Sequence, residues 1–362
     1  MSNEPKDSRV RILIVDDSAF MRAALSRLIA SDPDLSVVGS ACSGMEALQQ
    51  LPSLDPDVIT LDMRMPGLDG LETLRRIMAE FPRPVILVSS LTLKDAEITL
   101  NALEAGAFDY VPKQLSSTSL DIHHLRDDLI TKIKAAGESR HSRRQPSGLS
   151  QKPLQSGPML GREIVDSATS IVAIGTSTGG PKALQEILPA LPADLPVPIL
   201  IVQHMPLGFT APFAERLNSL CKVSVCEAKH GESVQAGVVY VAPAGSHMTV
   251  ERGVSRTAIC LSSQPENQLH TPSVDVMMQS VATAFRSTAM GIIMTGMGSD
   301  GAEGIKAIHR DGGFTLGQDE QTCAVYGMPR ACAGMGILDR IVPLSEIPHE
   351  IVLATRQRTS AG

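Results

Sequence analysis

Short runs of aliphatic residues alternate with amphipathic segments along two long stretches of the chain. A strand followed by a helix, repeated several times, is typical of a parallel sheet covered by helices on its faces. In the first stretch the runs are Val10–Val15, Val37–Val38, Val58–Leu61, Val85–Val88 and Tyr110–Val111. In the second they are Ile171–Ile174, Pro198–Val202, Val223–Val225, Val238–Val241, Ile259–Leu261 and Gly291–Thr295. The sequence therefore predicts two doubly wound α/β domains, the second larger than the first.

The two stretches are separated by a segment rich in Ser, Pro, Gly and basic residues, which reads GESRHSRRQPSGLSQKPLQSGP. Such a composition is poor in core-forming residues and indicates a flexible linker. We therefore place a first domain at 9–135, a linker at 136–166 and a second domain at 167–357.

Composition excludes several classes of protein. The 362 residues carry a formal net charge of -7, which argues against general affinity for nucleic acid. The polar N-terminal residues do not resemble a signal peptide, and no apolar run has the length of a membrane span. We therefore expect no direct membrane insertion. The 6 cysteines form no CxxC pair, so we expect reduced thiols in a cytoplasmic protein.

In the first domain, polar residues follow successive predicted strands. Asp16 and Asp17 follow the first, Asp62 the third, Ser89 the fourth and Lys113 the last. The carboxyl ends of parallel strands meet in one crevice, where three carboxylates repel one another unless a cation lies among them. Oxygen ligands of this kind suit Mg²⁺. Asp62 could then accept a phosphoryl group as a nucleophile, with Ser89 and Lys113 contacting its oxygens.

This domain resembles the receiver domain of two-component response regulators. The matching segments are ILIVDDSAFMR, DVITLDMRMPGLDG and AGAFDYVPK. The resemblance implies a flavodoxin-like fold, phosphorylation at Asp62 and Mg²⁺ held by Asp16, Asp17 and Asp62. It also implies that Ser89, Tyr110 and Lys113 act as switch residues.

In the second domain, an apolar run leads into Gly175-Thr-Ser-Thr-Gly179 and then a helical pattern. A G-x-S-x-G turn between strand and helix can expose a serine nucleophile, here Ser177. A phosphate-binding turn or a purely structural turn has the same appearance, so the turn alone leaves these readings open.

Two further strand ends favour the nucleophile. One predicted strand ends at His204, and another leads into a glycine-rich turn that carries Asp300. Ser177 would attack, His204 would take its proton, and Asp300 would orient the imidazole. The order Ser, His, Asp differs from the order in α/β-hydrolases.

These segments, attached to a receiver, resemble the chemotaxis response regulator protein-glutamate methylesterases. The motifs are AIGTSTGGPKAL, IVQHMP, VYVAPAGSHM, TPSVDVM and MTGMGSDGAEGI. The resemblance implies an αβα esterase domain with Ser177, His204 and Asp300 as catalytic triad and no cofactor at the esterase site. Backbone N–H groups of Met297 and Thr178 would stabilise the oxyanion. We expect His247 and Asp275 to be structural.

The resemblance also implies the reaction and the partners. The enzyme would hydrolyse glutamate methyl esters on chemoreceptors during chemotaxis adaptation, releasing methanol. A chemotaxis histidine kinase would phosphorylate Asp62, and the receiver would act as a lid over Ser177 until then. Whether the same site deamidates receptor glutamine stays open.

Two other functions are compatible with parts of the sequence. The second domain could be a non-catalytic module that binds a nucleotide or phosphate at the glycine turn. It could also be a DNA-binding output domain, although the acidic balance and the lack of a basic recognition helix argue against this.

Overall fold

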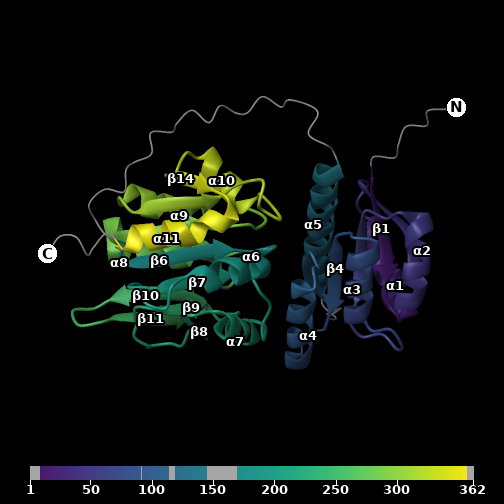
Figure 1. Cartoon of the computed structure of the whole chain (residues 1–362), viewed down its shortest axis with the longest axis horizontal. Helices are drawn as coiled ribbons and strands as arrows, with labels where there is room; N and C mark the ends of the chain where they lie inside the picture. The colour runs from purple at the N-terminus through teal and green to yellow at the C-terminus, as the bar shows by residue number, and fades with distance from the viewer. Residues whose placement is uncertain (1–8, 91, 114–118, 145–168, 357–362) are drawn as a thin grey trace. The chain divides into compact units, whose positions relative to one another are not determined.

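The structure, a computed structural model, describes residues 9–90, 92–113, 119–144 and 169–356. The chain divides into two compact units, Met1–Ser150 and Gln151–Gly362 (Figure 1). Each is an α/β unit built on a parallel sheet, which confirms the predicted fold class. Within the described residues, none of the helices combines the length and the apolar character needed to cross a membrane.

The first unit has a five-stranded sheet in the order β2-β1-β3-β4-β5, with parallel pairing throughout. The strands are β1 (Val10–Val15), β2 (Leu35–Ala41), β3 (Val58–Asp62), β4 (Val85–Ser89) and β5 (Asp109–Pro112). The helices are α1 (Ala19–Ala30), α2 (Gly44–Leu54), α3 (Gly70–Glu80), α4 (Leu93–Glu104) and α5 (Ser119–Arg144). Helix α1 packs against α5, whereas α3 packs against both α2 and α4.

Local sequence explains where these helices begin. Ser18, Ser43, Asp69 and Thr92 each stand before a helix in extended conformation. Each side chain accepts a hydrogen bond from the backbone N–H three residues later, which satisfies an otherwise unpaired donor of the first turn. These caps end the loops that leave β1, β2, β3 and β4, and the first of these loops carries Asp16 and Asp17.

The end of helix α5 overlaps the predicted linker. Helix α5 continues to Arg144, so it occupies the first part of the stretch 136–166, and the rest from 145 lies outside the described residues. Helix α5 extends this far because its buried face continues beyond the point that the composition of the sequence suggests. Leu129, Ile133 and Ala136 are fully buried, and Gly137 lies so close to Val10 that an added Cβ would be 2.9 Å from its methyl groups.

The second unit has a seven-stranded sheet in the order β14-β13-β12-β6-β7-β9-β8, again parallel. The strands are β6 (Ile171–Thr176), β7 (Ile199–Gln203), β8 (Ser224–Glu227), β9 (Val238–Val241), β12 (Ala289–Ile293), β13 (Phe314–Gln318) and β14 (Arg340–Val342). The α-helices are α6 (Gly180–Ile187), α7 (Thr210–Leu220), α8 (Val274–Phe285), α9 (Ala302–Arg310), α10 (Met328–Gly334) and α11 (Ile347–Arg356). Short 3₁₀ helices are η1 (Leu188–Ala190), η2 (Arg286–Thr288) and η3 (Leu344–Glu346).

Part of this unit was not predicted. Strands β13 and β14 extend the sheet beyond β12. Strand β11 (Thr257–Ser262), which contains the predicted run Ile259–Leu261, lies outside the main sheet. It pairs antiparallel with β10 (His247–Arg252) in a hairpin (Figure 1), and α8 packs against β10.

The strand order determines where the candidate catalytic residues lie. Strands β12, β6 and β7 are direct neighbours, with β6 in the middle. Ser177 follows β6 and His204 follows β7, and the last residues of these two strands are paired in register. Asp300 lies in the loop that leaves β12. The three side chains therefore start from one edge of the sheet.

We expect Ile133→Ala to destabilise the first unit by about 2–5 kcal/mol, because the substitution leaves a cavity beneath a fully buried position of α5. Differential scanning calorimetry measures the effect on the transition of each unit. Glu138→Ala, at an exposed position of the same helix, is the matched control and should leave both transitions in place. Unchanged melting of Ile133→Ala would show that this part of α5 does not belong to the core.

Candidate functional site

His204 and Asp300 form the central pair of the second unit. The Nε2 atom of His204 lies 2.8 Å from Oδ2 of Asp300, and the two side chains are only 9% and 12% exposed. A carboxylate can only accept, so the imidazole hydrogen is on Nε2. Nδ1 is then the nitrogen with a free lone pair, and it has no hydrogen-bond partner among the described residues. The basic nitrogen of His204 is therefore Nδ1.

Both carboxylate oxygens of Asp300 accept two hydrogen bonds each. Oδ1 accepts hydrogen bonds from the hydroxyl of Ser273 at 2.9 Å and the N–H of Asp275 at 3.0 Å. Oδ2 accepts from the N–H of Val274 at 2.8 Å as well as from His204. Burial alone would raise the pKa of Asp300, but the hydrogen bond and charge of His204, followed by the backbone donors, hold this pKa well below its usual range. The carboxylate is thus ionised at neutral pH.

The turn around Ser177 is held by its backbone. The N–H of Ser177 donates to the carbonyl of Thr295 at 3.0 Å, and its carbonyl accepts from the N–H of Gly180 and the side-chain amide of Gln203, both at 2.9 Å. Gly296 passes so close that a Cβ there would lie 2.9 Å from the Cβ of Ser177. These contacts hold the partly exposed Ser177 against the loop that follows β12.

Thr176 also holds this turn in place. Its side chain is fully buried, and its hydroxyl donates to the carbonyl of Thr295 at 2.8 Å. That carbonyl is also the acceptor for Ser177. The threonine hydroxyl therefore joins the two strand ends directly beneath the serine.

Two backbone N–H groups beside Ser177 are available. Within the described chain, the N–H groups of Thr178 and Met297 donate to no protein acceptor. Thr178 precedes α6, and Met297 follows Gly296 in the loop after β12. The arrangement suits stabilisation of an anion, although both roles stay predictions. The hydroxyl of Ser177 also makes no hydrogen bond to the described residues, so its bond to His204 is not formed here.

Sequence reasoning missed the residues that hold Asp300 and His204. Ser273 and the first N–H groups of α8 bind Asp300, and the ring of His270 stacks on that of His204 with centroids 4.0 Å apart. His247 is fully buried. Its Nδ1 accepts from the N–H of Ser273 at 3.1 Å, and its Nε2 faces the carbonyl of Pro265 at 3.2 Å. The motif TPSVDVM contained Ser273 and was the available signal.

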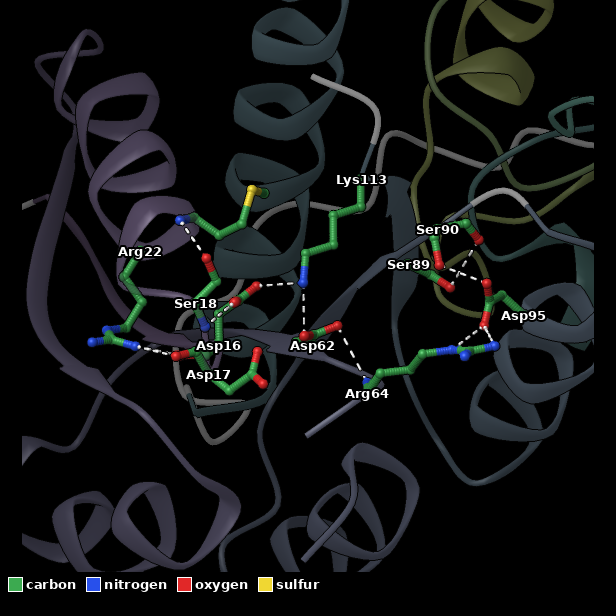
Figure 2. Close-up of polar contacts among 11 residues, drawn as sticks. Asp16, Asp17, Ser18, Arg22, Asp62, Arg64, Ser89, Ser90, Asp95 and Lys113 are labelled. Carbon is green, nitrogen blue, oxygen red and sulfur yellow. Dashed lines mark hydrogen bonds and ion pairs between the residues drawn. The ribbon is translucent and has the colours of Figure 1, made fainter. Parts of the chain in front are cut away.

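In the first unit, the acidic residues gather as predicted (Figure 2). One carboxylate oxygen from each of Asp16, Asp17 and Asp62 lies within 4.8 Å of the others. Asp16 and Asp62 are buried and Asp17 is exposed. Lys113 Nζ lies 2.7 Å from Oδ2 of Asp62 and 3.0 Å from Oδ2 of Asp16.

The electrostatics of this cluster fit a cation. Burial, with the charge of Asp16, raises the pKa of Asp62 even though Lys113 opposes the shift. Burial alone would lower the pKa of Lys113, but Asp62 and Asp16 raise it. Oδ2 of Asp16 is buried and accepts no hydrogen bond from the described residues, despite its ion pair with Lys113. One lysine thus leaves excess negative charge, and the oxygen donors suit Mg²⁺.

The other predicted switch residues have their own partners. Ser89 is buried, and its Oγ lies 2.8 Å from the hydroxyl of Thr99 in α4. Beside it, Arg64 forms an ion pair with Asp95, which also accepts from the hydroxyl of Ser90 (Figure 2). Tyr110 is buried, with Lys132 Nζ 5.4 Å from its ring centroid. Burial raises the pKa of Tyr110 well above its ordinary value.

Comparisons with known proteins agree with these geometries. Residues 172–351 match the family model described as CheB methylesterase, and residues 12–123 match the response regulator receiver domain. The chain is 44% identical to protein-glutamate methylesterase/protein-glutamine glutaminase 2 of Nitratidesulfovibrio vulgaris, over 95% of this chain and 98% of the relative. It is 42% identical to the protein of the same name from Pyrococcus abyssi, over 98% and 96%. The crystal structure of the Thermotoga maritima CheB methylesterase catalytic domain is 37% identical, with a TM-score of 0.50, over 51% of this chain and 98% of that chain.

Asp275 provides a test of the buried charges around Asp300. Burial, followed by the effect of Asp300, raises the pKa of Asp275 to about 6. In the unfolded chain an aspartate has a pKa near ~3.9, so the folded protein binds this proton more tightly than the unfolded chain does. Protonated Asp275 therefore favours the folded state at low pH, and this contribution to stability is lost as pH rises through about 6. Asp275→Asn keeps an acceptor for the N–H of Gly304 but cannot ionise. We expect its Tm to exceed that of wild type by several degrees at pH 8 and to match it at pH 4.

Asp311→Asn is the control for this pH series, with thermal melts monitored by circular dichroism. The hydrogen bond from Arg310 lowers the pKa of Asp311, so its loss should reduce stability at pH 8 rather than increase it. A lower Tm for Asp275→Asn at pH 8 would contradict the expected sign.

Proposed function

The chain belongs to the protein-glutamate methylesterase/protein-glutamine glutaminase family, and from that premise we propose how its residues perform and regulate ester hydrolysis. The substrate is a glutamate γ-methyl ester on a chemoreceptor, and the products are the glutamate carboxylate and methanol. The observation that carries the proposal is the His204–Asp300 pair at 2.8 Å, beside a serine on a strand-to-helix turn.

The first half of the reaction acylates the serine. The hydroxyl oxygen of Ser177 forms a bond to the ester carbonyl carbon while its proton moves to Nδ1 of His204. Asp300 stabilises the resulting imidazolium through Nε2. The tetrahedral intermediate then collapses, the bond to the methoxy oxygen breaks, and Nδ1–H donates its proton to that oxygen, which leaves as methanol. The N–H groups of Thr178 and Met297 donate to the oxyanion.

Hydrolysis of the acyl-enzyme completes the cycle. Water attacks the acyl carbon, its proton passes to Nδ1, and the bond to Ser177 breaks as the serine regains that proton. A glutamine side chain offers the same carbonyl, with ammonia in place of methanol as leaving group. Both activities named for the relatives therefore need only this one site.

The first unit is the regulator in this proposal. Asp62 accepts a phosphoryl group from a chemotaxis histidine kinase, and this phosphorylation raises the esterase activity of the second unit. Asp16, Asp17 and Asp62 would hold Mg²⁺, which neutralises phosphoryl oxygens when bound. Lys113 pairs with Asp62 before phosphorylation and can pair with the phosphoryl oxygens afterwards. The free cysteines suit a cytoplasmic site of action, where a receptor's signalling region lies.

We expect Ser177→Ala to lower methanol release from methylated chemoreceptor membranes by about 10⁴-fold or more, since no other group replaces the nucleophile. Asp300→Asn should lose about 10³–10⁴-fold, because an amide cannot accept from every donor around it. Ser219→Ala, on the exposed side of α7, is the control. No methanol release from either wild type or Ser177→Ala, together with a nucleotide-dependent rise in Tm, would favour the binding-module reading.

Phosphorylation is tested separately with acetyl phosphate as donor. We expect Asp62→Asn to take up no phosphoryl group and to keep unstimulated methanol release, whereas Asp127→Asn, at an exposed position of α5, behaves as wild type. Removal of Mg²⁺ with EDTA should abolish uptake on the wild type and leave unstimulated methanol release unchanged. Uptake that persists in EDTA would contradict the magnesium site, and stimulation of Asp62→Asn would contradict the regulatory role of this residue.

A further inference from the structure

The imidazole of His204 is held at its edge and on one face. Its edge is fixed by the hydrogen bond to Asp300. On one face it carries the ring of His270, with centroids 4.0 Å apart and an interplanar angle of 25°. The first contact belongs to the proposed catalytic triad, whereas no step of the proposed reaction uses His270.

The backbone around His270 is tied to the same network. The carbonyl of Thr271 accepts from the N–H of Gly245 at 3.1 Å. Ser273 donates its N–H to His247 and its hydroxyl to Asp300. The segment that carries His270 is therefore anchored by hydrogen bonds to Gly245, His247 and Asp300. These bonds define the position of the His270 ring.

A second contact on His204 has a physical purpose. The rotation of an imidazole about χ2 is broad, and one hydrogen bond at Nε2 restrains it only partly. Nδ1, on the other side of the ring, has no partner among the described residues that would fix it. A ring stacked on the face restricts this rotation because turning the imidazole would separate the two π surfaces or make them clash.

We propose that His270 is a positioning residue that holds Nδ1 of His204 in line with the hydroxyl of Ser177. The inference rests on the proposed serine esterase function and adds to it a residue that acts through His204 alone. An error of about 1 Å in a reacting group can cost on the order of 10²-fold in rate. Loss of the stacked ring should therefore reduce kcat and leave KM unchanged, because His204 reacts with bound substrate and does not bind it.

The test compares three variants in the full-length protein on membranes that carry a methylated chemoreceptor. His270→Ala removes the stacked ring, and we expect kcat to fall about 10-fold to 100-fold with KM within about twofold of wild type. His270→Phe keeps an aromatic face without a ring nitrogen and should recover most of kcat. Gln268→Ala, at an exposed position two residues earlier, is the control for changes in this segment.

The outcomes separate the proposal from its alternatives. Wild-type kcat in His270→Ala overturns it, as does a Phe variant as slow as the Ala variant, which would assign a polar role to His270. A rise in KM alone would make His270 a substrate contact. If wild type and Ser177→Ala are equally inactive, the proposed function itself fails. The stacking is then tested by the imidazole NMR signals of His204, which should shift in His270→Ala and stay unchanged in Gln268→Ala.

Discussion

The ionised carboxylate of Asp300 is the interaction on which the arrangement of the second unit depends. It lies at the N-terminus of α8, where backbone N–H groups have no partner within the helix and the helix dipole favours a negative charge. Val274 and Asp275 supply those N–H groups, and Ser273 supplies both the helix cap and a hydroxyl. Because these donors fix the carboxylate, the hydrogen bond to His204 has a defined direction and the imidazole has a defined tautomer.

The same network connects the hairpin to the site. Strand β10 begins at His247, whose side chain accepts from the N–H of Ser273, and β10 packs against α8. The hairpin therefore supports the end of α8 that binds Asp300, although it is not part of the main sheet. His247 is buried between the hairpin and the helix, and its hydrogen bonds to Ser273 and Pro265 account for both ring nitrogens.

Sequence predicted the parts of the site that depend on strand ends. Ser177, His204 and Asp300 could be found because each follows an aliphatic run, and parallel strands bring such positions to one edge. The stacked His270 could not be found, because its position depends on how the chain returns from the hairpin, which local pattern does not encode, whereas Ser273 lies in the motif TPSVDVM. Strands β13 and β14 were missed for a related reason. FTLGQ and RIV are short and interrupted by glycine or polar residues, and only pairing in the sheet makes them strands.

Asp62 and Asp300 have similar positions in their sheets but different proposed roles, because they accept different numbers of hydrogen bonds. Asp62 is the last residue of a parallel strand and Asp300 lies in the loop that leaves another, and each contacts one basic side chain at 2.7–2.8 Å. Asp300 receives two hydrogen bonds on each oxygen, which occupies its lone pairs and leaves it able only to orient and stabilise. Asp62 accepts one from Lys113 and a long one of 3.3 Å from the N–H of Arg64. Its remaining lone pairs can bind a metal ion or attack phosphorus, so the number of donors decides which aspartate reacts.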